Sequence, residues 1–321
     1  MELINKTIIS LTFLVSISSC GYKCADLRPL GKDWHKTGQN LEDDKGLVRA
    51  RKFSTYSAIY AIASVKSYHP DPAKVQPIPF PRQETWREDF DNGKIISGID
   101  DTIGFAARSW VRTKADLSKE LVVAYRGTTD FHKDFLFANL VPILPPGPVF
   151  RNQYDSALQY AQRAKAALGA EGETIPITLT GHSLGGGLAE YVQRYLKNSR
   201  AVTFDTSPNQ GRLYGILRPR ENPRENVRVY ERGEILSYFR YAMSPDICLE
   251  STPEGPGLRA AWVDFFFSNP VTAHGSHDLC LGLLKVAATD ESPEAQDVLR
   301  QLREQVVLYC PDERRRAESQ P

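Results

Sequence analysis

The sequence predicts an α/β protein with a mainly parallel central sheet that helices cover on both faces. Short apolar runs typical of strands alternate along the chain with longer segments in which apolar residues recur at helical spacing. Strands that alternate with helices form parallel sheets whose two faces are both covered. The chain has 321 residues, 41% of them hydrophobic, which is enough to build a substantial core.

The first elements are expected between residues 47 and 126. Apolar and small residues recur at helical spacing over residues 47–67, which predicts a helix, and a proline-rich loop follows at 69–81. Residues 101–111 and 120–126 then have the composition of strands. The polar segment 21–47 lacks a clear period and is expected to be a tether.

From residue 154 onward the pattern alternates regularly. Helices are expected at 154–168 and 185–196, an apolar helix-like run at 279–286, and a closing helix at 292–307. Strands are expected at 175–180, 200–204 and 226–230. No repeat and no linker to a second domain is visible, so residues 47–321 are expected to form one domain.

The composition excludes several classes of protein. With 40 basic and 39 acidic residues the net charge is +1, so the chain lacks the positive field that captures nucleic acid. The motifs H-E-x-x-H, C-x-x-C and the Walker loop are absent from the sequence. We therefore expect no metal, no cofactor and no nucleic-acid partner. The oligomeric state does not follow from the sequence.

The N-terminus has the pattern of an export signal. An apolar run, IISLTFLVSI, occupies residues 8–17 after Lys6; it is too short to span a bilayer well and has the length of a signal-peptide core. It is followed by Ser18, Ser19 and Cys20, and small residues before a cysteine resemble a bacterial lipoprotein cleavage site. An ordinary secretory signal, with Cys20 incidental, is the alternative.

The lipoprotein resemblance implies a layout and a location. Residues 1–19 would be a signal peptide, and residues 20–46 a tether anchored to the membrane through lipidated Cys20. The protein would lie in the bacterial cell envelope, at the outer membrane facing the periplasm, because Gly21 rather than aspartate follows the cysteine. The remaining cysteines could form two disulfides in an oxidising compartment or stay as thiols; they are Cys24, Cys248, Cys280 and Cys310.

The strongest chemical signal surrounds Ser183. The sequence ITLTGHSLGGG has the order strand, G-x-S-x-G, helix, and Gly181 and Gly185 flank the serine. A serine at a sharp strand-to-helix turn projects its hydroxyl off the sheet edge, and the glycines let neighbouring backbone pass closely. The helix that starts behind the serine directs its N-terminal dipole toward a developing oxyanion. Ser183 is therefore the candidate nucleophile.

A second motif, VVAYRGT, ends at Thr128. Followed by TGHSLGG, it resembles the class 3 (fungal-type) lipase family of α/β hydrolases, and softer similarities extend over roughly residues 50–285. The resemblance implies an α/β-hydrolase fold and a serine ester hydrolase, a lipase or phospholipase. It also implies an oxyanion hole made by Thr128 and by the backbone N–H of Leu184. The resemblance implies that His182 is a packing residue of the turn around Ser183, not a base.

A serine triad in this family runs in the order serine, acid, histidine. The histidines beyond the serine motif are His274 and His277; we favour His277 as the general base because it opens an apolar helix-like run, and His274 is the alternative. The resemblance implies Glu234 as the acid, where the family usually has aspartate. Asp205, which stands where the family has glycine, is a second candidate, and Glu231 and Asp246 are weaker ones.

The substrate is less well defined than the chemistry. Residues 135–150 are apolar and rich in proline, and lie where the family has its lid; a packed loop is the alternative. We expect hydrolysis of carboxylic esters of lipids through an acyl-enzyme. The alternatives are a serine acyltransferase or thioesterase with the same triad, and an inactive hydrolase-fold binding protein of the envelope.

Overall fold

The computed structural model describes most of the predicted domain. The described residues are 45–68, 77–88, 90–91, 94–95, 98–100, 103–127, 148–207, 222, 225–231, 258–263 and 275–309. The predicted signal peptide and nearly all of the tether therefore lie outside the described residues, as do Cys20 and most of the predicted lid. No helix among the described residues is long and apolar enough to cross a membrane.

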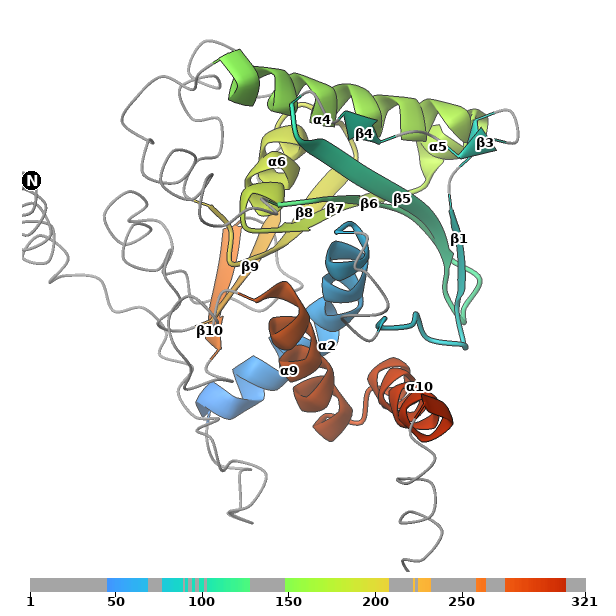
Figure 1. Ribbon diagram of the computed structural model, residues 1–321, viewed down its shortest axis with the longest axis vertical. Helices are drawn as coiled ribbons and strands as arrows, with labels where there is room; N and C mark the ends of the chain where they lie inside the picture. Colours follow the sequence, from blue (N-terminus) through green and yellow to red (C-terminus); the bar gives the residue numbers. More distant parts are fainter. Residues whose placement is uncertain are drawn as a thin grey trace, which may run out of the picture.

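The core of the fold is one large sheet with the strand order β1-β5-β6-β7-β8-β9-β10 (Figure 1). Strands β6 to β10 are parallel to one another. The strands on this path are β1 (Thr85–Glu88), β5 (Phe105–Thr113), β6 (Lys119–Tyr125), β7 (Ile177–His182), β8 (Ser199–Phe204), β9 (Asn226–Glu231) and β10 (Leu258–Val263). The prediction of a mainly parallel central sheet is confirmed.

One side of the sheet departs from that prediction, because β1 and β5 run antiparallel to their neighbours. The connection from β5 to β6 is a short turn in which Leu117 has φ 65°, and the Asp116 side chain accepts the Ser118 backbone N–H at 2.9 Å. So short a connection permits only an antiparallel pair. The short strand β4 (Ile99–Asp100) also pairs with β5, while β2 (Phe90–Asp91) and β3 (Lys94–Ile95) form a separate ribbon.

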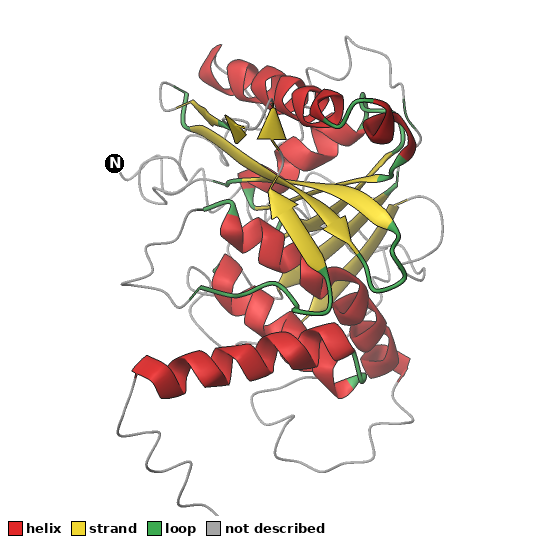
Figure 2. Ribbon diagram, turned by 90° about the vertical axis from the view of Figure 1, so that its right-hand side faces the viewer, coloured by secondary structure: helices red, strands yellow, loops and turns green. Residues whose placement is uncertain are grey.

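Helices cover both faces of the sheet (Figures 1 and 2). One face carries α4 (Pro148–Ala167), α5 (Ala170–Thr174) and α6 (Leu184–Gln193), and the other carries α2 (Lys45–Lys66), α9 (Ser276–Thr289) and α10 (Pro293–Tyr309). Helix α4 begins earlier than the predicted residue 154. Proline suits the first helical position because it has no N–H to leave unpaired there, so Pro148 can begin the helix.

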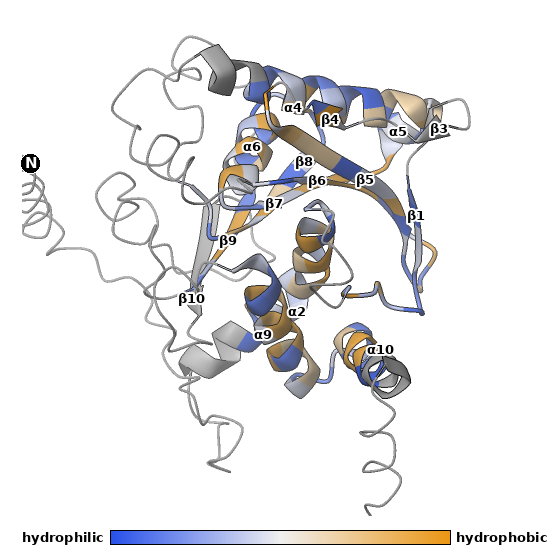
Figure 3. Ribbon diagram, viewed as in Figure 1, coloured by the Kyte–Doolittle hydropathy of each residue, from blue (hydrophilic) through white to orange (hydrophobic). Residues whose placement is uncertain are grey.

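The two faces of β6 illustrate how the strands build two cores. Leu121, Val123 and Tyr125 belong to the cluster beneath α4 and α6, whereas Val122 and Ala124 belong to the cluster around α2 and α9. Successive side chains of a strand point to opposite faces, so a strand buried on both faces is a continuous apolar run. Apolar residues of α2 and α9 accordingly belong to one buried cluster with those of the sheet, and both helices have strongly apolar stretches (Figure 3).

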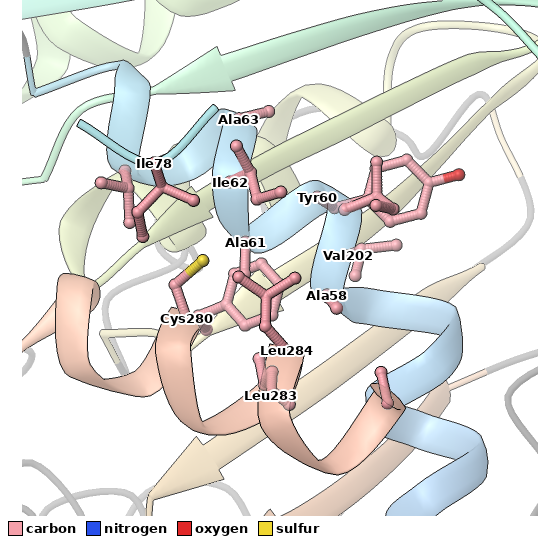
Figure 4. Close-up of a cluster of buried hydrophobic side chains, with 14 of the residues drawn as sticks. Ala58, Tyr60, Ala61, Ile62, Ala63, Ile78, Val202, Cys280, Leu283 and Leu284 are labelled. Atoms are coloured by element: carbon pink, nitrogen blue, oxygen red, sulfur yellow. The ribbon is translucent and has the colours of Figure 1, made fainter. Parts of the chain in front are cut away.

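Small side chains bring α2 close to the sheet and to α9 (Figure 4). Ala58, Ala61 and Ala63 are all at most 3% exposed, and Ala61 lies beside Leu284 of α9 in the close-up. Cys280 is a buried free thiol in this cluster, and burial raises its pKa. Cys280 packs here as an apolar side chain, while Cys24, Cys248 and Cys310 lie outside the described residues, so the pairing of these cysteines stays a prediction.

A buried polar cluster lies near the amino ends of the parallel strands. The carboxylate of Glu120 in β6 accepts hydrogen bonds from Tyr60 of α2 (3.1 Å), Arg112 of β5 (2.7 Å), Thr178 of β7 (2.9 Å) and Arg200 of β8 (3.2 Å). Arg112 is the residue directly opposite Glu120 across the β5–β6 pair. One carboxylate thus joins a helix to four neighbouring strands.

The charge on Glu120 is stabilised by its neighbours. Burial alone would raise the pKa of this carboxyl group, but the charges of Arg112 and Arg200 outweigh burial and lower the pKa below its ordinary value. A carboxyl group with a lowered pKa in the folded state stabilises the fold above its unfolded pKa of about 4.3. That contribution is lost as the pH falls through the folded-state pKa.

We predict that Glu120→Gln lowers the free energy of unfolding by about 3 kcal/mol at pH 7, because Arg200 loses its buried counter-charge and Arg112 keeps only its ion pair with Glu84. This corresponds to roughly 5–10 °C in the midpoint of thermal unfolding. The matched control is Glu171→Gln, which removes an exposed ion pair with Lys119 and should leave the midpoint nearly unchanged. The difference between wild type and Glu120→Gln should shrink as the pH falls below 4; a constant difference would contradict the electrostatic account.

Candidate active site

Ser183, the predicted nucleophile, lies at one edge of the sheet. The parallel strands β6, β7, β8, β9 and β10 end there at Tyr125, His182, Phe204, Glu231 and Val263. The register places His182 opposite Phe204, and Glu231 opposite Val263. Carboxyl ends of parallel strands are where α/β folds carry their functional loops.

Three of the predicted residues come soon after one of these strand ends in the sequence. Ser183 comes directly after β7, Thr128 comes shortly after β6, and Glu234 comes shortly after β9. Thr128 and Glu234 themselves lie outside the described residues, as do His274 and Asp246. Their roles therefore remain predictions, although the strands that lead to Thr128 and Glu234 end at the same edge as the strand that leads to Ser183.

Ser183 has a strained backbone. It is the residue before helix α6 and has φ 57° and ψ −124°, which is a rare conformation for a residue with a side chain. Such strain persists only where the surrounding structure enforces it, and it is typical of nucleophile turns in α/β hydrolases. The predicted strand–serine–helix order is thus present in the structure.

Hydrogen bonds hold this backbone from both sides. The Ser183 N–H donates to the carbonyl oxygen of Phe204 at 2.9 Å. The Ser183 carbonyl oxygen accepts the N–H of Gly187 at 3.3 Å and that of Ser207 at 3.0 Å. The serine is therefore tied to its own helix and to the end of β8, the neighbouring strand.

The flanking glycines are required by close backbone approach. A Cβ atom on Gly185 would lie 2.1 Å from the carbonyl oxygen of Tyr125, and one on Gly181 would lie 2.4 Å from the carbonyl carbon of Gly185. The first turn of α6 therefore packs directly against the ends of β6 and β7. Leu184, whose N–H is the proposed second oxyanion donor, is the first residue of this helix.

Helix α6 is anchored to the sheet by a buried ion pair. Glu190 of α6 accepts a hydrogen bond from Arg228 Nε of β9 at 2.6 Å, and a second bond joins Arg228 Nη2 to the other carboxylate oxygen. Thr203 of β8 also donates to Glu190, at 3.2 Å. Although burial alone would lower the pKa of Arg228, the pairing with Glu190 raises it, so the guanidinium stays charged.

His277 lies in the first turn of α9, after the N-cap residue Gly275. Its side chain is partly exposed, and its Nδ1 atom is 3.8 Å from Asp278 Oδ1. A partly exposed imidazole at the start of a helix is accessible to substrate. Its role as general base remains a prediction.

Asp205, the second candidate for the acid, lies deep in the structure. Its side chain is fully buried, and its Oδ1 atom accepts the backbone N–H of Glu231 at 2.7 Å. Its Oδ2 atom is 3.8 Å from Nε2 of His182. The carboxylate thus faces the histidine next to the candidate nucleophile.

Tyr68 is a residue of the site that the sequence reasoning did not single out. Its hydroxyl oxygen is 3.1 Å from Nδ1 of His182, a residue 114 positions away in the chain. It also lies against Gly127 of the predicted oxyanion turn, where a Cβ atom would come within 2.3 Å of the hydroxyl oxygen. No local pattern around Tyr68 reveals such a long-range contact.

The fold and this turn define a class of protein. A mostly parallel sheet covered on both faces, with a strained serine between a strand and a buried helix, is the architecture of an α/β-hydrolase serine enzyme. The chain therefore has the α/β-hydrolase fold, with Ser183 at the position that the nucleophile takes in this fold. The family model that matches is described as phospholipase-like, the Tle-like phospholipase domain, and it matches residues 83–239, which include the serine turn.

Solved structures of lipases are similar to this chain at low identity. The lipase from Rhizopus microsporus var. chinensis is 16% identical, with 67% of this chain and 75% of that chain covered and a TM-score of 0.37. Lipase II from Rhizopus niveus is 17% identical, with 61% and 77% covered and a TM-score of 0.36. M37 lipase is 13% identical, with 79% and 94% covered and a TM-score of 0.36. No curated protein sequence matches this chain.

Proposed function

We propose that this protein hydrolyses carboxylic esters of lipids through an acyl-enzyme on Ser183. The observation that carries the proposal is the strained Ser183 backbone at the carboxyl edge of the sheet, within the segment that matches the phospholipase-like family. That family supports a phospholipid as the first substrate class to test. An acylglycerol is the second.

The proposed reaction has two halves. Ser183 Oγ attacks the ester carbonyl while His277 takes its proton, and the same imidazole returns the proton to the leaving alcohol. The oxyanion is stabilised by the backbone N–H groups of Thr128 and Leu184 and by the dipole of α6. Water then attacks the acyl-enzyme by the same route. Glu234 orients His277 and stabilises its cation throughout.

The arrangement of the strands supports this assignment of roles. The segments that carry Thr128, Ser183 and Glu234 follow the ends of β6, β7 and β9, in the order oxyanion turn, nucleophile, acid. His277, in the first turn of α9, is the proposed base. Because the carboxyl ends of parallel strands lie at one edge of a sheet, residues that follow them can converge on one ester group, which supports the proposal.

We predict that the purified full-length protein hydrolyses a short-chain nitrophenyl ester and a phosphatidylcholine substrate, and that Ser183→Ala lowers both rates by at least about 10⁴-fold. Removal of the nucleophile leaves only the residual effect of the oxyanion donors. The measurement is product release, by absorbance for the ester and by fatty-acid titration for the lipid.

The controls separate the alternatives. Turnover of the short ester alone would indicate a carboxylesterase rather than a lipase, and transfer of the acyl group to an added alcohol in preference to water would indicate an acyltransferase. A folded protein that neither hydrolyses the two substrates nor is labelled at Ser183 by a fluorophosphonate would refute the enzymatic proposal.

A second prediction concerns the acid and the base. We expect Glu234→Gln to lower kcat by about 10³- to 10⁴-fold without changing the thermal midpoint, because a neutral amide cannot stabilise the imidazolium. His277→Gln should lower kcat at least as strongly, whereas His274→Gln should retain most of the activity. The reverse result for the two histidines would transfer the role of base to His274.

We also propose that the chain is a lipoprotein of the bacterial cell envelope, with signal peptide 1–19, tether 20–46 and enzyme domain 47–321. The pattern Ser18-Ser19-Cys20 after an apolar run supports this proposal. The lipid anchor would hold the site near a bilayer, its proposed source of substrate.

Mass spectrometry of the mature N-terminus should find an acylated Cys20, and Cys20→Ser should shift the protein from the membrane fraction to the soluble fraction. An unmodified N-terminus at another residue would favour the ordinary secretory signal.

A further inference from the structure

A set of buried polar contacts extends from His182, the residue before the candidate nucleophile, to neighbouring strand ends. It begins at Tyr68, just after helix α2, whose hydroxyl oxygen is 3.1 Å from Nδ1 of His182 and 3.4 Å from the His182 carbonyl oxygen. Burial raises the pKa of the Tyr68 hydroxyl, so it remains a neutral donor and acceptor.

Tyr68 also contacts the predicted oxyanion turn. Gly127, in that turn, lies directly against its hydroxyl group. The fit is tight, since a Cβ atom on Gly127 would lie 2.3 Å from the Tyr68 hydroxyl oxygen, 2.5 Å from the His182 carbonyl oxygen and 3.3 Å from Cβ of Ser183. The turn after β6 and the nucleophile after β7 are thus held together with Tyr68 between them.

The contacts continue from His182 to Asp205. His182 Nε2 lies 3.8 Å from Asp205 Oδ2, and both side chains are at most 5% exposed. Asp205 Oδ1 accepts the N–H of Glu231 at 2.7 Å. Asp205 itself has φ 41°, in the left-handed region that favours glycine and tolerates aspartate or asparagine.

These contacts join four strand ends that no single element connects. They link the turn after β6 through Tyr68 to His182 at the end of β7, then to Asp205 after β8 and to Glu231 at the end of β9. The oxyanion turn follows β6, the nucleophile follows β7, and the proposed acid follows β9. The contacts therefore span the three segments whose separation determines the geometry of the reaction.

We propose that Tyr68, His182 and Asp205 are positioning residues, which set the distance between the oxyanion turn and Ser183 and hold the end of β9 in register. The inference rests on the proposed function and deepens it. Misplacement of a reacting group by about 1 Å can cost about 10²-fold in rate, so a small shift of the turn would be visible in kcat. Tyr68 and Asp205 act through His182 and do not touch the substrate.

The test uses full-length protein and two variants that change single groups. Tyr68→Phe removes only the hydroxyl. Asp205→Asn removes the charge that faces His182 but keeps an oxygen for the Glu231 N–H and tolerates the positive φ. The measurements are kcat and KM for the nitrophenyl ester, the rate of labelling by a fluorophosphonate and the thermal midpoint.

Two matched controls lie away from the site. Tyr160→Phe, on helix α4, removes a buried hydroxyl that is 3.1 Å from Ser109 Oγ of β5. Asp297→Asn neutralises a buried carboxylate that, like Asp205, accepts a backbone N–H at 2.7 Å, here from Arg82. Each control removes the same chemical group as the site variant with which it is compared. It should lower the stability by about the same amount.

If the inference holds, each site variant lowers kcat and the labelling rate by about ten- to a hundredfold with KM within twofold. Its thermal midpoint should fall no further than that of its control. Because both residues act through His182, the double variant Tyr68→Phe/Asp205→Asn should lose less than the product of the two single losses.

Three outcomes would overturn it. Variants that lose stability but keep kcat, as the controls should, would show that the contacts are only structural. A loss near 10⁴-fold in Asp205→Asn, with Glu234→Gln almost fully active, would make Asp205 the triad acid instead. If wild-type protein fails to react with the fluorophosphonate and hydrolyses neither substrate, the proposed function fails and this inference fails with it.

Discussion

The backbone conformation of Ser183 is the constraint on which the rest of the site depends. A residue with a side chain at φ 57° is strained, and the strain is maintained only by what surrounds it. The Phe204 carbonyl holds the serine amide, and Ser207 holds its carbonyl. The lack of a Cβ on Gly181 and Gly185 lets α6 start against β6 and β7. A larger residue at either glycine would move the helix and, with it, the serine.

The two ends of the parallel strands perform different tasks. At the amino ends, Glu120 connects Tyr60 of α2 with Arg112 of β5 and Arg200 of β8 in a buried cluster, and Glu84 supplies the second carboxylate, on Arg112. At the carboxyl ends, strand termini lead into the oxyanion turn, the nucleophile and the proposed acid. Stability is thus concentrated at one end and chemistry at the other, so a change at Glu120 should affect unfolding far more than turnover.

The sequence predicted best those elements whose signals are local. Strand β6 is an apolar run buried on both faces, and the serine turn combines two glycines with a strand before it and a helix after it, so both were recognised. Strand β10, with the sequence LRAAWV, has no alternation of polar and apolar residues and was missed. The antiparallel side of the sheet was also missed, because pairing direction depends on the connection rather than on composition.

The contacts around the site show why long-range features were beyond sequence reasoning. In the sequence, Asp205 differs from the glycine that is usual in the class 3 lipase family. Its φ of 41° and its burial against His182 are visible only in three dimensions. Tyr68 reaches the same histidine from 114 positions away. Such contacts leave no period and no motif in the chain.

An aspartate at position 205 makes interactions that glycine could not make there. Glycine would adopt a positive φ at this position without strain, whereas aspartate adopts it at some cost. In return, the aspartate side chain supplies an acceptor for the Glu231 amide and a negative charge beside the His182 ring. A glycine here would leave the amide at the end of β9 without this acceptor, deep in a buried environment where an unmade hydrogen bond is expensive. Aspartate is therefore more strained than glycine at this position, but it connects the end of β7, which precedes the nucleophile, to the end of β9, which leads to the proposed acid.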